Sequence, residues 1–217
     1  MTEKNIIVAL DDPLNYQSVL DALDPKKCIL KVGSVIFNYH GRKILDEVAN
    51  HSFEIFFDIK FHDIPNTVSK SIESFKGYPI KLLTIHLSGG FSMIKSALDA
   101  SKNINAKCIG VSILTSLSRE DILEITSSEF DIYFDKLISV AKNTNIDGVV
   151  CSPSELNKLK DFSKLKVVPG IRNRISEDDQ KRIMSSNDAY QNGADFIVVG
   201  RPITLSKDPA KALEFFI

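Results

Sequence analysis

Residues 53–67 read Phe-Glu-Ile-Phe-Phe-Asp-Ile-Lys-Phe-His-Asp-Ile-Pro-Asn-Thr, an apolar run that passes into a cluster of charges. A short run rich in aromatic and β-branched residues is typical of a strand. In an extended segment, alternation puts Asp58 and Lys60 on the same face, and Asp63 follows just beyond the point where the chain turns. The stretch therefore predicts a strand whose end presents an ammonium group among carboxylates.

Comparable apolar runs recur along the chain, at intervals long enough to hold helices. We expect eight strands, near Ile6–Leu10, Cys28–Val32, Phe53–Ile59, Leu82–Leu87, Cys108–Leu114, Gly148–Cys151, Lys166–Pro169 and Phe196–Gly200. Nearly continuous apolar strands that alternate with helices indicate a parallel sheet covered by helices. Eight such units favour an α/β fold of the closed (β/α)₈ TIM barrel type, in a single domain over residues 1–217, rather than an open doubly wound sheet.

The clearest helical pattern covers Phe130–Asn143. The residues expected to share one face of this helix are Ile132, Leu137, Ile138 and Ala141. The interval from residue 115 to residue 147 is long enough to contain one extra short helix.

Composition excludes several classes of protein. The chain has 217 residues, of which 43% are hydrophobic, and a formal net charge of -1. The near-neutral charge argues against a broad attraction to nucleic acid or to an anionic membrane. No stretch approaches the roughly 18 apolar residues of a membrane span, and residues 1–4 lack a signal-peptide pattern, so we expect a cytoplasmic protein. Cys28, Cys108 and Cys151 are widely spaced in apolar runs, which favours buried thiols over disulfides.

Polar residues follow the predicted strands at the end where barrel enzymes carry their active sites. These strand ends carry Asp11, Lys31, Asp58 with Lys60, His86, Thr115, Pro169-Gly170 and Gly200-Arg201. A lysine held near two carboxylates should keep its proton and could deliver it to a carbanion that forms beside it. The alternative is a structural ion pair at the barrel rim. Asp11 and Lys31 either pair with each other or reach toward the lysine cluster and a sugar hydroxyl.

The last two strands end in a candidate phosphate site, at Arg172 and at Gly200-Arg201. Glycine lets an anion approach the backbone, arginine can bind two phosphate oxygens, and this is the common phosphate position of the fold. Gln180 could close over the same phosphate. His86 is interpreted as a packing residue and His62 as a rim residue, and no spaced metal-binding cluster is found, so we expect no metal.

The same residues are similar to those of a known family. Over nearly its whole length the chain resembles the orotidine 5′-phosphate decarboxylases of bacterial type. The matching segments are Val8-Ala9-Leu10-Asp11, Lys31-Val32-Gly33, the stretch from Phe57 to Thr67, Thr84-Ile85-His86, Leu114-Thr115-Ser116, Val168-Pro169-Gly170-Ile171-Arg172 and Val199-Gly200-Arg201-Pro202-Ile203. The third of these is highly specific.

The resemblance implies cofactor-free decarboxylation of orotidine 5′-monophosphate to UMP and carbon dioxide, the last step of de novo UMP synthesis. It also implies that Lys60 protonates C6 of the pyrimidine and that Asp58 lies beside the departing carboxylate. The implied substrate contacts are Asp11 and Lys31 at the ribose, Thr115 near the pyrimidine, and Arg172, Gln180, Gly200 and Arg201 at the phosphate. Because the family is homodimeric, Asp63 and Thr67 are expected to reach into the partner's site.

Two other functions stay open. Keto-gulonate phosphate decarboxylases and hexulose phosphate synthases share the Asp-x-Lys-x-x-Asp core, but they are expected to place a glutamate for Mg²⁺ where this chain has Lys31. A catalytically silent barrel that only binds nucleotides is the second alternative. It would keep Gly200-Arg201 and lose the charged cluster, which is present here.

Overall fold

The computed structural model describes residues 5–172 and 184–217. In this part of the chain eight parallel strands form a closed barrel, in which each strand pairs with the next and the last pairs with the first. The strands are β1 Ile6–Leu10, β2 Ile29–Gly33, β3 Ile55–Phe61, β4 Ile80–His86, β5 Lys107–Val111, β6 Gly148–Val150, β7 Leu165–Pro169 and β8 Phe196–Val199. The predicted TIM barrel is confirmed, with each strand within a few residues of its expected place.

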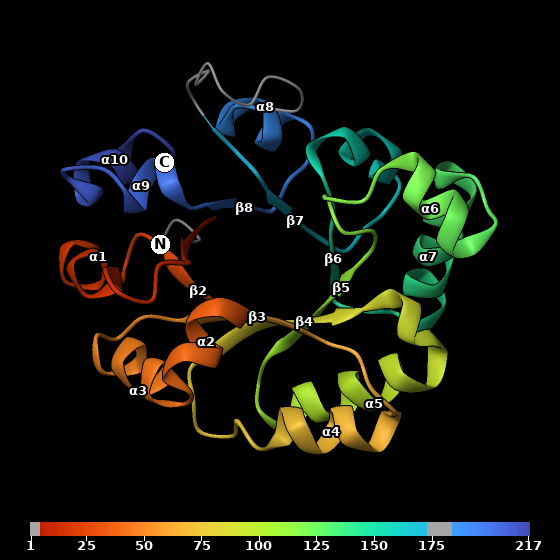
Figure 1. Cartoon of the computed structure of the whole chain (residues 1–217), viewed down its shortest axis with the longest axis horizontal. Coiled ribbons are helices and arrows are strands. Elements are labelled where there is room, and N and C mark those ends of the chain that lie inside the picture. Colours follow the sequence, from red (N-terminus) through yellow and green to blue (C-terminus); the bar gives the residue numbers. More distant parts are fainter. Residues whose placement is uncertain (1–4, 173–183) are drawn as a thin grey trace.

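Helices surround the strands on all sides (Figure 1). The α-helices in the described residues are α1 Tyr16–Ala22, α2 Ser34–His40, α3 Lys43–Asn50, α4 Pro65–Glu73, α5 Gly90–Asn103, α6 Arg119–Thr126, α7 Phe130–Thr144, α8 Ser186–Gln191, α9 Arg201–Thr204 and α10 Pro209–Glu214. The extra short helix expected before residue 147 is α6. Between β6 and β7 the connection is a 3₁₀ helix, Pro153–Leu159, instead of an α-helix, and a second 3₁₀ turn, Leu87–Gly89, precedes α5.

The expected helix at Phe130–Asn143 is confirmed as α7, but one of its predicted core residues was wrong. Leu137, Ile138 and Ala141 are buried, whereas Ile132 is 52% exposed. Five residues separate Ile132 from Leu137, which is a rotation of about 140° around the helix and therefore a different face. Phe134, three residues before Leu137, fills the buried position instead.

The barrel interior is an apolar plug made by alternate strand residues. It consists of Ile7, Ala9, Ile29, Phe56, Leu82, Ile109, Val167, Phe196 and Val198. The residues between them, such as Val8 and Leu30, belong to the larger core beneath the helices. Because strand side chains repeat with a period of two, the next inward positions above the plug fall to polar residues. These are Asp11 after Ala9, Lys31 after Ile29, Asp58 after Phe56 and Thr84 after Leu82.

The three cysteines are buried and form no disulfide in the described structure, as the sequence predicted. Burial raises the pKa of the Cys108 thiol to about 12. No helix in residues 5–172 and 184–217 is both long and apolar enough to cross a bilayer.

Candidate active site

Four charged side chains form a row of alternating sign above the apolar plug. The Lys31 Nζ atom lies 2.8 Å from Asp11 Oδ1 and 3.8 Å from Asp58 Oδ2. The Lys60 Nζ atom lies 2.9 Å from Asp58 Oδ1. Lys31 and Asp58 expose only 12% and 14% of their side chains. Lys31 therefore does both things that the sequence left open, since it pairs with Asp11 and also reaches the lysine cluster.

The end of β3 is not a regular strand. Asp58 and Lys60 are neighbours as predicted, but simple alternation in an extended segment is not the reason. Lys60 has a φ of 53°, in the left-handed region, and the pairing of β3 with β4 shifts register between Phe57 and Phe61. A bulge of this kind re-aims the side chain that follows it. Lys60 thus owes its direction to a local break in the strand.

Thr84 of β4 lies beside this break, and the sequence interpretation assigned it no role. Its hydroxyl donates to Asp58 Oδ1 at 3.0 Å and accepts from the backbone N–H of Lys60 at 3.0 Å. Thr84 is fully buried. The signal that could have found it is the period of two, because Leu82 belongs to the interior plug and Thr84 is the next inward residue of the same strand.

Two glycines lie close to the charged row. A Cβ atom on Gly33 would come within 2.9 Å of Lys31 Nζ and 3.6 Å of Asp11 Oδ1. A Cβ atom on Gly200 would lie 3.7 Å from Asp11 Oδ2. The end of β8 therefore adjoins the charged row directly, as the pairing of β1 with β8 requires.

The predicted phosphate residues stand at the ends of the last two strands. Arg172 is half-buried, and its backbone N–H donates to the carbonyl of Met184 at 3.2 Å. Arg201 is exposed at the start of α9, directly after Gly200. Gln180 lies outside the described residues.

Three other predicted residues are not joined to the row by a hydrogen bond or an ion pair in the described part of the chain. Asp63 is exposed, and its carboxylate accepts the N–H of Ile64 at 2.7 Å. Thr67 is half-buried in α4, and Thr115 is exposed in the loop between β5 and α6. The structure therefore does not join Asp63, Thr67 or Thr115 to the charged row through hydrogen bonds or ion pairs of the described residues.

His86 ends β4 beside His62, with 5.1 Å between the ring centroids. Burial lowers the pKa of His86, and the charges of His62 and Lys60 lower it further, while Asp58 opposes this effect. In the described residues, no group of three or more histidine, cysteine or acidic side chains is arranged to hold a metal ion.

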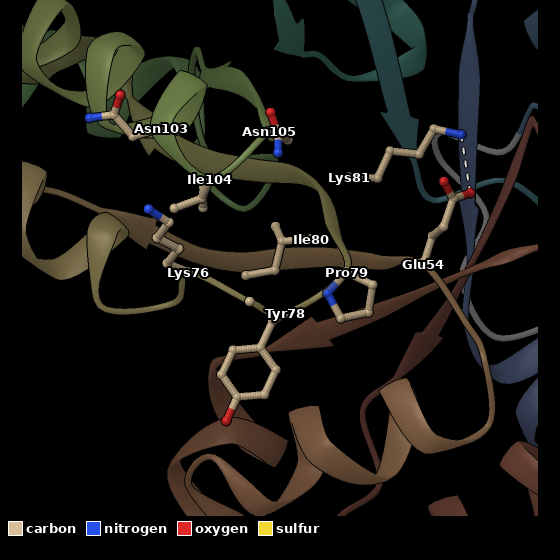
Figure 2. A pocket seen from close by; sticks show the side chains of 10 residues that line it. Glu54, Lys76, Tyr78, Pro79, Ile80, Lys81, Asn103, Ile104 and Asn105 are labelled. Carbon is tan, nitrogen blue, oxygen red and sulfur yellow. Dashed lines mark hydrogen bonds and ion pairs between the residues drawn. The ribbon is translucent and has the colours of Figure 1, made fainter.

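A hollow of about 580 Å³ lies at the opposite end of the barrel. Figure 2 shows Lys81 and Glu54 paired on one side of it and the end of α5 on the other; the ion pair measures 3.2 Å. Glu54 precedes β3 and Lys81 is the second residue of β4, so this hollow adjoins the amino ends of the strands. Barrel enzymes place their chemistry at the carboxyl ends, where the charged row lies.

Comparisons with known proteins identify the family of this chain. The model of the orotidine 5′-phosphate decarboxylase / HUMPS family matches residues 4–216. The orotidine 5′-phosphate decarboxylase of Laribacter hongkongensis is 37% identical over 96% of this chain and 89% of that protein. The protein of the same name from Wolbachia sp. subsp. Brugia malayi is 40% identical over 98% of this chain and 97% of its own.

A solved structure gives the same answer for the fold. The crystal structure of orotidine 5′-phosphate decarboxylase from Lactobacillus acidophilus superposes with a TM-score of 0.86 at 34% identity, over 98% of this chain and 96% of that one. The chain therefore belongs to the orotidine 5′-phosphate decarboxylase / HUMPS family.

Proposed function

We propose that this chain decarboxylates orotidine 5′-monophosphate to UMP and carbon dioxide, the last step of de novo UMP synthesis, without a cofactor. The observation that carries the proposal is the row Asp11, Lys31, Asp58 and Lys60 at the carboxyl ends of three adjacent strands. An alternating row holds each charge opposite its counter-charge, so a proton donor can be held in one position in a half-buried site.

In the proposed mechanism the substrate carboxylate lies beside Asp58, and Lys60 lies beside the carbon from which it departs. The bond from C6 to the carboxylate breaks, its electron pair stays on C6, and a proton moves from Lys60 Nζ to C6. The 2.9 Å contact with Asp58 Oδ1 supports this arrangement because it holds the ammonium group next to the position of the leaving group. Asp11 and Lys31 would hold the ribose.

The phosphate would lie at the ends of β7 and β8, held by Arg172, Gly200 and Arg201, with Gln180 closing over it. The position of Gly200 next to Asp11 supports this, since it brings the proposed phosphate and ribose contacts together. The phosphate is remote from the bond that breaks. Its binding energy can therefore be used to close loops and position the pyrimidine, which Thr115 would contact.

We also propose a homodimer in which Asp63 and Thr67 complete the partner's site. Support comes from the exposure of Asp63 and from two apolar residues on the neighbouring elements, Ile64 and Phe91, which are 66% and 56% exposed. Exposed apolar side chains are typical of an interface where they gather into one patch, which is what the proposal expects of Ile64 and Phe91. A cytoplasmic location is part of the same proposal, and fractionation of expressing cells would test it.

The sugar-phosphate alternative needs carboxylates for Mg²⁺ at the end of the second strand. Lys31 occupies that place, and its ammonium group pairs with both neighbouring carboxylates. A cation there would repel Mg²⁺ instead of binding it.

The test is a decarboxylation assay on purified protein in EDTA, with orotidine 5′-monophosphate and, in parallel, keto-gulonate phosphate with Mg²⁺. Turnover of the nucleotide in EDTA is the expected result. Turnover of the sugar phosphate alone would show that the chain is a sugar-phosphate enzyme. Binding of UMP without turnover of either substrate would show that it is a catalytically silent nucleotide-binding barrel.

A further inference from the structure

The Thr84 hydroxyl has its hydrogen-bond directions fixed by its two partners. The backbone N–H of Lys60 can only donate, so Thr84 Oγ1 accepts from it, at 3.0 Å. The single proton of the hydroxyl is then left for Asp58 Oδ1, also at 3.0 Å. Asp58 Oδ1 receives the Lys60 ammonium group as well, at 2.9 Å. Thr84 therefore closes a ring of contacts through both the side chain and the backbone of Lys60.

The backbone of Lys60 needs such a partner. A non-glycine residue with a φ of 53° adopts a conformation that L-residues disfavour, and it persists only when its surroundings hold it. The register shift between β3 and β4 removes regular strand pairing at this point, and the Thr84 hydroxyl takes the N–H that the ladder would otherwise use. Threonine also suits this role because its branched Cβ restricts rotation about χ1 and therefore the position of the hydroxyl oxygen.

We propose that Thr84 is a positioning residue. It holds the backbone of Lys60 and the carboxylate of Asp58 at a fixed distance from each other for the proton transfer. The inference rests on the proposed decarboxylase function for its kinetic consequence. Its structural consequence, protection of the Lys60 amide, does not depend on that function. Within residues 5–172 and 184–217, the hydrogen bonds of Thr84 join it to Asp58 and Lys60 and not to the ends of β7 and β8, so its proposed role is separate from phosphate binding.

The test compares Thr84→Val, which removes the hydroxyl at nearly constant volume, with Thr84→Ser, which keeps it. Because misplacement by about 1 Å can cost on the order of 100-fold in rate, we expect Thr84→Val to lower kcat by about that factor with little change in KM. Thr84→Ser should recover most of the loss. Ser112→Ala is the matched control, since Ser112 is another buried hydroxyl near a strand end, but it donates to the carbonyl of Val150. It should leave kcat unchanged.

Hydrogen exchange of the Lys60 amide, measured by NMR, supplies the second readout. It should accelerate at least about tenfold in Thr84→Val relative to its strand neighbours and remain slow in Thr84→Ser. If Thr84→Val does not fold, Thr84→Ala gives the same comparison, because alanine also lacks the hydroxyl and places no γ-methyl group next to the amide.

A Thr84→Val protein with wild-type kcat and a protected Lys60 amide would overturn the inference, as would loss of kcat in Thr84→Ser equal to that in Thr84→Val. A wild-type protein without turnover would instead contradict the proposed function. The exchange measurement would still decide the role of Thr84 in that case.

Discussion

Lys60 is held at two points, its ammonium group and its backbone N–H. Its ammonium group contacts Asp58, and its backbone N–H is bound by Thr84. A lysine side chain has several rotatable bonds, so one contact at its tip would leave the atom free to move with the chain beneath it. Two contacts define where the proton is held. The site therefore depends on the position of Lys60 as much as on its charge.

Replacement of Lys60 by alanine should lower kcat by about 100- to 10,000-fold, the range that a positioned general acid contributes, while binding of UMP persists. Kinetics and UMP titration measure the two effects. The matched control is Lys81→Ala, which removes a lysine with the same 33% side-chain exposure and a comparable ion pair at the far end of the barrel. Turnover of Lys60→Ala at the level of Lys81→Ala would exclude Lys60 as the proton donor.

Gly33 is predicted to matter for activity more than for stability. An added methyl group would lie 2.9 Å from Lys31 Nζ, which is the far end of a flexible side chain and not backbone, so the ammonium group would shift at small cost to folding. We expect Gly33→Ala to lower kcat/KM by about 10- to 100-fold and the free energy of unfolding by less than about 1 kcal/mol.

Gly110→Ala should instead reduce stability more than activity. Its methyl group would come within 2.4 Å of Leu87 in the packed core, so we expect a loss of about 1–3 kcal/mol in the free energy of unfolding. Urea denaturation and steady-state kinetics on both variants measure the contrast. Equal effects of the two substitutions on activity would contradict the role given to Gly33.

At the scale of the elements, β4 contributes both Thr84 and His86 to the carboxyl end of the barrel. The pKa of His86 is lowered in the folded protein, so the unfolded chain binds a proton more readily. Stability must then fall as the pH drops below the ordinary histidine value of about 6.5. Urea denaturation at several pH values should show this decrease, and His86→Gln should make it smaller. A decrease of the same size in both proteins would assign it to other groups.

The residues at the ends of β7 and β8 are predicted to contribute to the affinity for the substrate phosphate. Removal of the Arg201 side chain should lower kcat/KM for the nucleotide by about 10- to 100-fold, because a charge-assisted contact to phosphate is lost. Lys207→Ala, which removes an exposed charge six residues later, is the control and should have little effect. Steady-state kinetics with both variants measure the difference. Unchanged kcat/KM in Arg201→Ala would place the phosphate elsewhere.

At the scale of the whole molecule, we propose that a second chain is needed to complete the site. Asp63 lies in solvent next to exposed Ile64 and has no ion pair with Lys60 in the described residues. A second copy packed against α4 would cover this apolar surface and could receive Asp63 in its own site. Shared sites of this kind make activity a property of the dimer.

Mixing of Asp63→Ala chains with Lys60→Ala chains tests this sharing. In a random 1:1 mixture half of the dimers are mixed and one of their two sites is intact, so about a quarter of wild-type activity should return. The control mixes Asp58→Ala with Lys60→Ala, whose residues belong to the same site of one chain, and it should recover nothing. Absence of activity in isolated mixed dimers of the first kind would contradict donation of Asp63 across an interface.

The strands could be predicted because burial on both faces leaves an apolar run that is visible without knowledge of its neighbours. The pairing of Asp58 with Lys60 could be predicted because the two residues lie two positions apart in one short stretch. Strand ends were less accurate. The fifth strand was expected to reach Leu114 but ends at Val111, since Ser112 and Ile113 are buried in the loop and look like a continuation of the strand.

Only the tertiary structure decided which charges meet. Lys31 contacts both Asp11 and Asp58 because the pairing of β2 with β1 on one side and with β3 on the other sets the three strands side by side. The left-handed backbone of Lys60 and the Thr84 hydroxyl beside it depend on the register shift between β3 and β4. Register is a relation between two strands, so no pattern within one strand can record it.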